Sequence, residues 1–228
     1  MNSDTLIKPE TGRYVVSISK QELAQLPSAV YQGKVVLIDS DQDAAKAADI
    51  LAAEEIIGFD TETKPSFKRS QSNQVALLQL STHTHCFLVR LNHIGLHPDL
   101  RRILEDPHRL KVGVSVHDDF HHLAKAFNLH PQGFIDLQAF VKDYKIIDNS
   151  LSRIYGILFG HRISKGQRLT NWEAHELTIH QQEYAALDAY ACIRIYEYLV
   201  KNGFTPEQSI YYHFVPQEEH DANGKLQG

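Results

Sequence analysis

The stretch IIGFDTET, residues 56–63, decides the fold of this chain. Its apolar first half is typical of a buried strand, and its second half brings two acids to the end of that strand. Because side chains alternate between the two faces of a strand, Asp60 and Glu62 project from the same face. Neighbouring carboxylates repel each other unless a cation lies between them, and oxygen ligands favour Mg²⁺ or Mn²⁺. The alternative explanation is a strand that runs into a solvated acidic turn.

Strands and helices alternate on either side of this stretch. Residues 74–81 and 85–91 are apolar runs around a short polar turn, and we predict that they form a hairpin. A hairpin followed by strands that alternate with helices indicates a mixed α/β sheet. We predict further strands at 35–39 and 110–116, and helices over 41–55, 97–106, 118–127, from Ser150 to near Gly160, and 178–201.

The length and charge of the chain limit its architecture and its partners. The 228 residues suggest one domain, which we assign to residues 34–203, with an N-terminal extension at 1–33 and a C-terminal tail at 204–228. The net charge of −5 argues against sequence-independent wrapping of nucleic acid, whose affinity depends on many Lys and Arg contacts with phosphate. It is compatible with an enzyme that grips a few nucleotides while metal ions neutralise the remaining charge.

The hydropathy and the cysteine content bear on the cellular compartment. No stretch approaches the ~20 consecutive apolar residues of a membrane span, and MNSDTLIKPE at the N-terminus has no signal-peptide character. Cys86 and Cys192 are the only cysteines, too few for a disulfide framework in a chain of this size. These features predict a cytoplasmic protein without a membrane partner.

The helix predicted over 178–201 carries an acid on its apolar face. Thr178 and Gln181 fit a capping box at its start. At about 100° per residue, Asp188 falls within the apolar stripe, and Tyr184 lies one turn before it on the same face. A buried carboxylate without a partner costs several kcal/mol. Asp188 must therefore be protonated, bound to a metal, or paired with an Arg or Lys from another element.

A further acidic motif is HDDFHHL, residues 117–123. Helical periodicity places Asp119 at the edge of the buried stripe, whereas Asp118 faces water or caps the helix. His117 and His121 are four residues apart, as in part of the zinc-hydrolase motif. A zinc site also needs a third protein ligand and partners that orient the ligands, and nothing nearby in the sequence clearly supplies them. We expect exposed histidines, with a zinc hydrolase as the alternative.

The motifs together contain four acids without a basic partner, namely Asp60, Glu62, Asp119 and Asp188. Such a set suits two divalent cations about 3.5–4 Å apart, the arrangement that activates water in phosphoryl transfer. In this order, FDTET, VGVSVHDDFHHL and YAALDAY resemble the three motifs of the tyrosine-bearing branch of the DEDD 3′→5′ exonucleases, the family of ribonuclease D and the Werner syndrome exonuclease. The resemblance covers roughly residues 34–202.

The resemblance implies an RNase H-like fold, with a mixed sheet of five to six strands and helices on both faces. It implies that Asp60 bridges two ions, Mg²⁺ or Mn²⁺, and that Asp119 supports one of them. The other ion, held by Glu62 and Asp188, activates a water that Tyr184 orients. By this resemblance, the water attacks the terminal phosphodiester of DNA or RNA with a free 3′ end and releases a nucleoside 5′-monophosphate.

Two basic stretches are candidates for holding the substrate. Basic side chains can hold phosphate, and an aromatic ring can stack on a base. For the first stretch, a solvated loop is the alternative, and we expect Trp172, the only Trp, to be a packing residue. The candidate substrate-binding residues are Lys64, Phe67, Lys68 and Arg69 after the first motif, and Lys165 and Arg168 before the last helix.

A second class of function stays open beside the exonuclease. A protein of this fold can be a catalytically weak nucleic-acid-binding module. Such a module usually has a substituted ligand, and none of the four acids is missing here. The sequence names no protein partner and does not separate DNA from RNA, because the 2′-OH is recognised by the shape of the pocket. It therefore favours the enzyme and predicts a substrate with a free 3′ end.

Overall fold

The computed structural model describes residues 11–65 and 74–217. Its main feature is a six-stranded sheet with the strand order β2-β5-β4-β3-β6-β7. The strands are β2 (Lys34–Ile38), β3 (Ile56–Thr63), β4 (Val75–Ser81), β5 (His85–Arg90), β6 (Leu110–Gly113) and β7 (Phe134–Asp136). The antiparallel run β3-β4-β5 contains the predicted hairpin, and β2, β6 and β7 pair in parallel with their neighbours. The mixed α/β sheet is confirmed.

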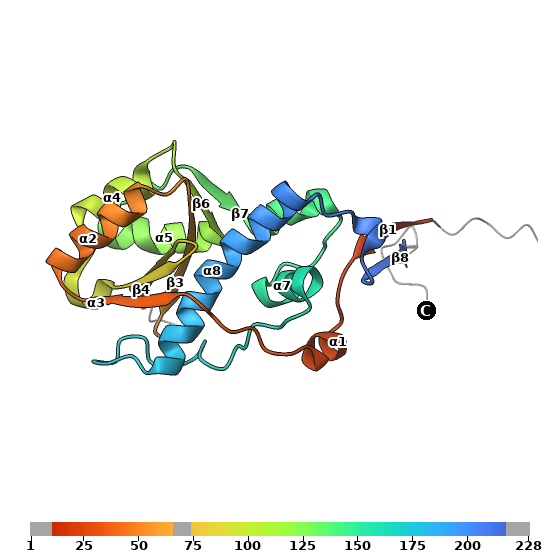
Figure 1. Cartoon of the computed structure of the whole chain (residues 1–228), viewed down its shortest axis with the longest axis horizontal. Helices are drawn as coiled ribbons and strands as arrows, with labels where there is room; N and C mark the ends of the chain where they lie inside the picture. Colours follow the sequence, from red (N-terminus) through yellow and green to blue (C-terminus); the bar gives the residue numbers. More distant parts are fainter. Residues whose placement is uncertain (1–10, 66–73, 218–228) are drawn as a thin grey trace, which may run out of the picture.

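Helices cover both faces of this sheet (Figure 1). One layer holds α2 (Asp41–Ala52), α3 (Leu91–Ile94), α4 (Pro98–Glu105) and α5 (Val116–Phe127), packed on a core that includes Ile57, Phe59 and Leu78. The other layer holds α6 (Leu137–Phe140), the 3₁₀ turn η1 (Val141–Tyr144), α7 (Leu151–Phe159) and α8 (Ile179–Asn202). In the part of the chain that is described, no helix is long and apolar enough to cross a membrane.

Helix α8 begins and ends where the sequence predicts. The Thr178 side chain accepts from the backbone N–H of Gln181, and the Gln181 side chain accepts from that of Thr178, which completes the capping box. At the other end Gly203 has φ of 63°, the left-handed conformation that glycine adopts without strain. At the start of α7 the Ser150 side chain accepts from the backbone N–H of Arg153, and Gly160 ends that helix with φ of 65°. These local signals fix the helix that carries Asp188.

Helix α8 lies directly against β3. A Cβ atom added to Gly58 would come within 2.0 Å of the carbonyl oxygen of Ala189, so no larger residue fits at this position. Ala185 and Ala189 of α8 are fully buried. The close approach explains how an acid on α8 reaches the acids at the end of β3.

The predicted strand at 110–116 is too long. Strand β6 ends at Gly113, and α5 begins at Val116 after Ser115, whose φ of 60° is left-handed. The apolar run continues past the strand because Val116 is buried as the first residue of the helix. Periodicity cannot separate these two uses of a buried valine.

The segments outside residues 34–203 contain elements that the sequence did not indicate. Strand β1 (Gly12–Val16) pairs antiparallel with β8 (Tyr212–Pro216), with α1 (Lys20–Gln25) and the 3₁₀ turn η2 (Pro206–Gln208) beside them in the chain. In Figure 1 this two-stranded sheet lies at the end of the molecule away from α2 and α4. Val16 is fully buried, and its N–H donates to the carbonyl oxygen of Lys145 at 2.8 Å. The N-terminal extension therefore packs against the main domain at Lys145.

Candidate active site

Three of the predicted acids come together between β3 and α8. One carboxylate oxygen from each of Asp60, Glu62 and Asp188 lies within 4.8 Å of the other two. Among the described residues, they form the only group of three or more His, Cys, Asp or Glu side chains that could hold a metal ion. Glu62 and Asp188 are buried, and Oδ1 of Asp188 has no hydrogen-bond partner in the described part of the chain. An orphaned buried oxygen inside a carboxylate cluster fits a cation site.

The electrostatics of this cluster explain why a cation suits it. Burial, and then the neighbouring charges of Asp188, Glu62 and Asp119, hold the pKa of Asp60 well above its usual range. Burial raises the pKa of Glu62 to about 9, and it raises that of Asp188 to about 7. Each carboxylate thus resists ionisation beside the others, and a divalent cation reverses that penalty.

Asp119 reaches the site from α5 and is held differently. Its Oδ1 accepts a hydrogen bond from Oγ1 of Thr61 at 2.5 Å, and Asp119 is not a member of the group formed by Asp60, Glu62 and Asp188. Burial raises the pKa of Asp119 to about 7, although the Thr61 bond opposes the shift. His117 and His121 are exposed on the same helix and, among residues 11–65 and 74–217, belong to no candidate metal group, so this part of the chain gives no support to the zinc alternative.

Tyr184 stands one helical turn from Asp188, as the sequence predicts. Its pKa is raised, first by burial and then by the charges of Asp188, Glu62 and Asp60. The phenol therefore keeps its proton and can donate a hydrogen bond, whereas a phenolate base is disfavoured. The fully buried ring of Trp172 lies 6.1 Å from the Tyr184 ring, centroid to centroid, and confirms the packing role expected of this Trp.

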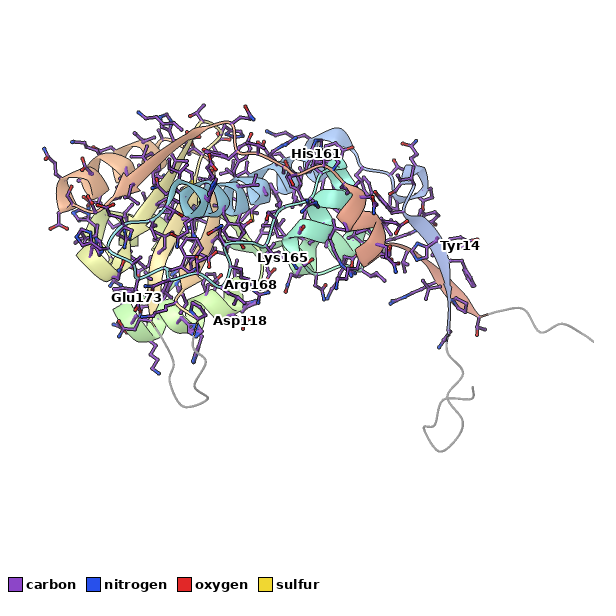
Figure 2. All side chains as sticks on the ribbon, turned by 90° about the horizontal axis from the view of Figure 1, so that it is seen from below. Tyr14, Asp118, His161, Lys165, Arg168 and Glu173 are labelled. Atoms are coloured by element: carbon purple, nitrogen blue, oxygen red, sulfur yellow. The ribbon has the colours of Figure 1, made fainter. Side chains whose placement is uncertain are left out.

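The cations predicted to hold substrate occupy the segment before α8. Burial raises the pKa values of Glu62 and Asp188, and the charges of Arg168 and Lys165, respectively, oppose part of that rise. Both cations therefore lie within electrostatic reach of the cluster. Figure 2 shows Lys165 and Arg168 on one stretch of chain, with Glu173 and Asp118 toward the same lower edge of the view.

The loop after β3 meets this basic segment from the other side. Nζ of Lys64 lies 3.1 Å from Oε2 of Glu173, which joins the end of β3 to the stretch before α8. The other candidates of that loop, Phe67, Lys68 and Arg69, lie outside the described residues.

A buried arginine anchors the segment before α8 and was missed by sequence reasoning. Arg90 ends β5 and is almost fully buried, and its guanidinium donates to the carbonyl oxygens of Ala174 at 2.5 Å and His175 at 3.3 Å. These bonds fix the chain beside Trp172. The only signal in the sequence was an arginine inside an apolar run, HCFLVRL.

We expect the metal-free protein to lose stability as the pH rises. The folded-state pKa values of Asp119 and Asp188 are about 7 and that of Glu62 is about 9, all above the value of about 4 in an unfolded chain. The folded state therefore binds more protons across this interval, and the free energy of unfolding falls as the pH rises through it. Thermal melts in chelator should give a lower Tm at pH 8.5 than at pH 6.

Two comparisons make this test specific. The difference in Tm should shrink in Asp188→Asn, which removes one of the titrating groups. It should also shrink when saturating Mg²⁺ is present, because the cation favours the ionised carboxylates. A Tm in chelator that is equal or higher at pH 8.5 would contradict the assigned direction of the pKa shifts.

The acids lie at the end of strand β3, on the flanking helix α5 and on the long helix α8 that crosses the sheet, as the three sequence motifs predict. The family model described as 3′-5′ exonuclease matches residues 35–203. The chain belongs to the 3′–5′ exonuclease family, and the resemblance seen in its motifs is confirmed.

Curated relatives carry the same domain inside longer proteins. The bifunctional 3′-5′ exonuclease/ATP-dependent helicase WRN of Mus musculus is 27% identical over 192 residues, covering 80% of this chain and 14% of the relative. The exonuclease 3′-5′ domain-containing protein 2 of Drosophila melanogaster is 32% identical over 187 residues, covering 77% of this chain and 31% of the relative. The chain thus spans less than a third of the length of either relative.

Solved structures share the fold. The Nibbler EXO domain of Aedes aegypti superposes with a TM-score of 0.69 at 22% identity, covering 78% of this chain and 95% of that domain. Escherichia coli RNase D, an exoribonuclease involved in structured RNA processing, superposes with a TM-score of 0.65 at 26% identity, covering 73% of this chain and 44% of that protein. The RNase H-like fold is confirmed.

Proposed function

We propose that this chain is a 3′→5′ exonuclease that hydrolyses the terminal phosphodiester of a nucleic acid with a free 3′ end. The observation that carries the proposal is the convergence of Asp60, Glu62 and Asp188 within 4.8 Å, with one buried oxygen of Asp188 left without a partner. Membership of the 3′–5′ exonuclease family supports the reaction class.

The four acids of the site would bind the cations, and Tyr184 would position the attacking water. Asp60, Glu62 and Asp188 would hold the cations, with Asp119 supporting a second ion from α5. When bound, two cations such as Mg²⁺ or Mn²⁺ make water more acidic and neutralise phosphate charge. The carboxylates that have raised pKa values in the free protein become ligands only when ionised, so binding of the cations releases protons.

Tyr184 orients the attacking water. Its neutral hydroxyl donates a hydrogen bond to the water oxygen, which attacks the terminal phosphorus in line. The attacking water gives up one proton to solvent, the bond from phosphorus to the 3′-oxygen of the preceding nucleotide breaks, and that oxygen takes up a proton from solvent. The products are a nucleoside 5′-monophosphate and a strand shorter by one residue, again with a free 3′-hydroxyl.

The test uses 5′-labelled single-stranded DNA and RNA oligomers and 3′-recessed duplexes, each with Mg²⁺, Mn²⁺ or chelator. A ladder that shortens from the 3′ end, requires the cation and releases mononucleotide would support the proposal. RNA is included because a structure that shares this fold, Trypanosoma brucei RNase D, has been solved in complex with RNA U12. Tight binding of intact oligomers in every lane would instead favour the catalytically weak binding module.

The phosphate contacts assigned to Lys165 and Arg168 should make the binding of nucleic acid depend on salt concentration. In an Asp188→Asn background, which prevents turnover, we expect Lys165→Gln and Arg168→Gln each to weaken binding of a fluorescent single-stranded oligomer. Each should reduce the slope of log Kd against log salt by about 0.7, the value for one lost phosphate contact. Lys46→Gln on α2, across the sheet, is the matched control and should leave the slope unchanged. Unaltered slopes for both site variants would remove these residues from the substrate path.

A further inference from the structure

Gln79, in the middle of β4, is a buried polar residue whose side-chain amide makes no hydrogen bond within the described part of the chain. Its exposed fraction is 0%, and neither Nε2 nor Oε1 has a hydrogen-bond partner among the described residues. Leaving such a group unpaired inside a protein is costly, because it has given up its hydrogen bonds to water and gained none in return. Gln79 therefore requires an explanation that packing alone does not supply.

The register of the sheet places Gln79 beside the metal-site candidates. Gln79 is paired directly with Asp60 on β3, and with Leu88 on β5 at its other side. Because neighbours in register share a face, the Gln79 amide and the Asp60 carboxylate project side by side. The same face is covered by α8, which also contacts β3 and carries Asp188.

Asp60 is the polar side chain that lies directly in register with Gln79, and Leu88 is its partner on the other side. Leu88 and Leu77 on the same face have no polar side-chain atoms. The Ser81 hydroxyl, next along this face, already donates to backbone carbonyl oxygens of its own turn. On α8, the Cys192 thiol donates to the carbonyl oxygen of Asp188 at 3.3 Å. Each of these neighbours is apolar or already engaged.

We infer that Gln79 is a positioning residue for Asp60: its amide N–H donates to the Asp60 carboxylate and orients that carboxylate for the cations. The inference rests on the proposed function, because it assigns the hydrogen bond to the cation-loaded state. Carboxylates that bind metals are themselves hydrogen-bonded by a surrounding layer of partners, and losing such a partner costs affinity. An amide is suited to this place because it donates without adding a charge to a crowded acidic cluster.

The test separates positioning from packing by using Gln79→Met, which keeps the length of the side chain and removes its donor. We expect the affinity for Mn²⁺, measured by calorimetry on the substrate-free protein, to fall by about 10- to 100-fold. The Tm in chelator should be unchanged or higher, because the variant removes an unpaired buried amide. Hydrolysis should need more Mn²⁺ for half-maximal rate and recover at saturating Mn²⁺.

The matched control is Leu88→Met, a buried apolar exchange on the other side of Gln79, which should leave the Mn²⁺ affinity unchanged. A Gln79→Met protein with wild-type Mn²⁺ affinity, or one that unfolds in chelator, would overturn the inference and make Gln79 a structural residue. Wild-type protein that binds no Mn²⁺ at all would instead overturn the cation site in the proposed function. The two failures are therefore distinguished by the wild-type titration.

Discussion

Asp188→Asn is expected to abolish nucleotide release while leaving the fold intact. The substitution keeps the shape of the side chain but removes the charge from one of the three clustered carboxylates. Stabilisation by a bound cation is worth several kcal/mol. Because each 1.36 kcal/mol changes a rate tenfold, the expected loss is at least about 100-fold. Mononucleotide release at saturating Mn²⁺, followed over time, measures it.

A stability measurement separates this outcome from misfolding. In chelator, Asp188→Asn should melt at a temperature equal to or above that of the wild type, because a carboxyl that is costly to ionise has been removed from the cluster. Asp118→Asn is the matched control, since Asp118 is exposed on α5 next to Asp119 and should retain full activity. Exonuclease activity that survives in Asp188→Asn would exclude the proposed cation ligands.

The second large effect is expected from Trp172→Ala. This side chain is fully buried against the Tyr184 ring, and truncation of a buried Trp to Ala costs about 3–5 kcal/mol through lost burial and the cavity that remains. For a domain of this size each kcal/mol shifts Tm by about 2–4 °C, so the melting temperature should fall by about 6–20 °C. Scanning calorimetry in chelator measures this change.

Trp172→Phe provides the comparison, because it keeps an aromatic ring beside Tyr184 and leaves a smaller cavity. Nε1 of Trp172 has no partner in the described structure, so Phe gives up no hydrogen bond. We therefore expect Trp172→Phe to lose less than half of the stability that Trp172→Ala loses. Equal losses would show that the ring contact with Tyr184 contributes little.

The parts of the structure that sequence predicted are those set by local chemistry. The capping box at Thr178 and the left-handed glycines after α7 and α8 mark helix ends without any tertiary information. The strand end with Asp60 and Glu62 follows from alternation, and the buried Asp188 from helical periodicity. The convergence of these acids was expected from the resemblance, and their distances and burial come from the structure.

The parts that sequence missed depend on contacts between distant segments. Arg90 is buried because carbonyl groups more than 80 residues later accept its hydrogen bonds. Gln79 lies in an apolar run, and only the register of β3 against β4 places it beside Asp60. The left-handed backbone at Ser115 was missed because this conformation is usually marked in a sequence by glycine, and here the residue is serine. Strands β1 and β8 were missed because each is short and finds its partner at the far end of the chain.

The pairing of β1 with β8 cannot form until both strands have been synthesised. Val16 and Tyr212 are partners in that two-stranded sheet but lie about 200 residues apart in the chain. At about 5–20 residues per second, β1 waits about 10–40 s after its own synthesis for its partner to be made. During that interval the apolar side chains of Val15 and Val16, buried in the finished fold, lack the partner strand that helps to bury them. The start of this chain is therefore among the last parts of the molecule to acquire its native pairing during synthesis.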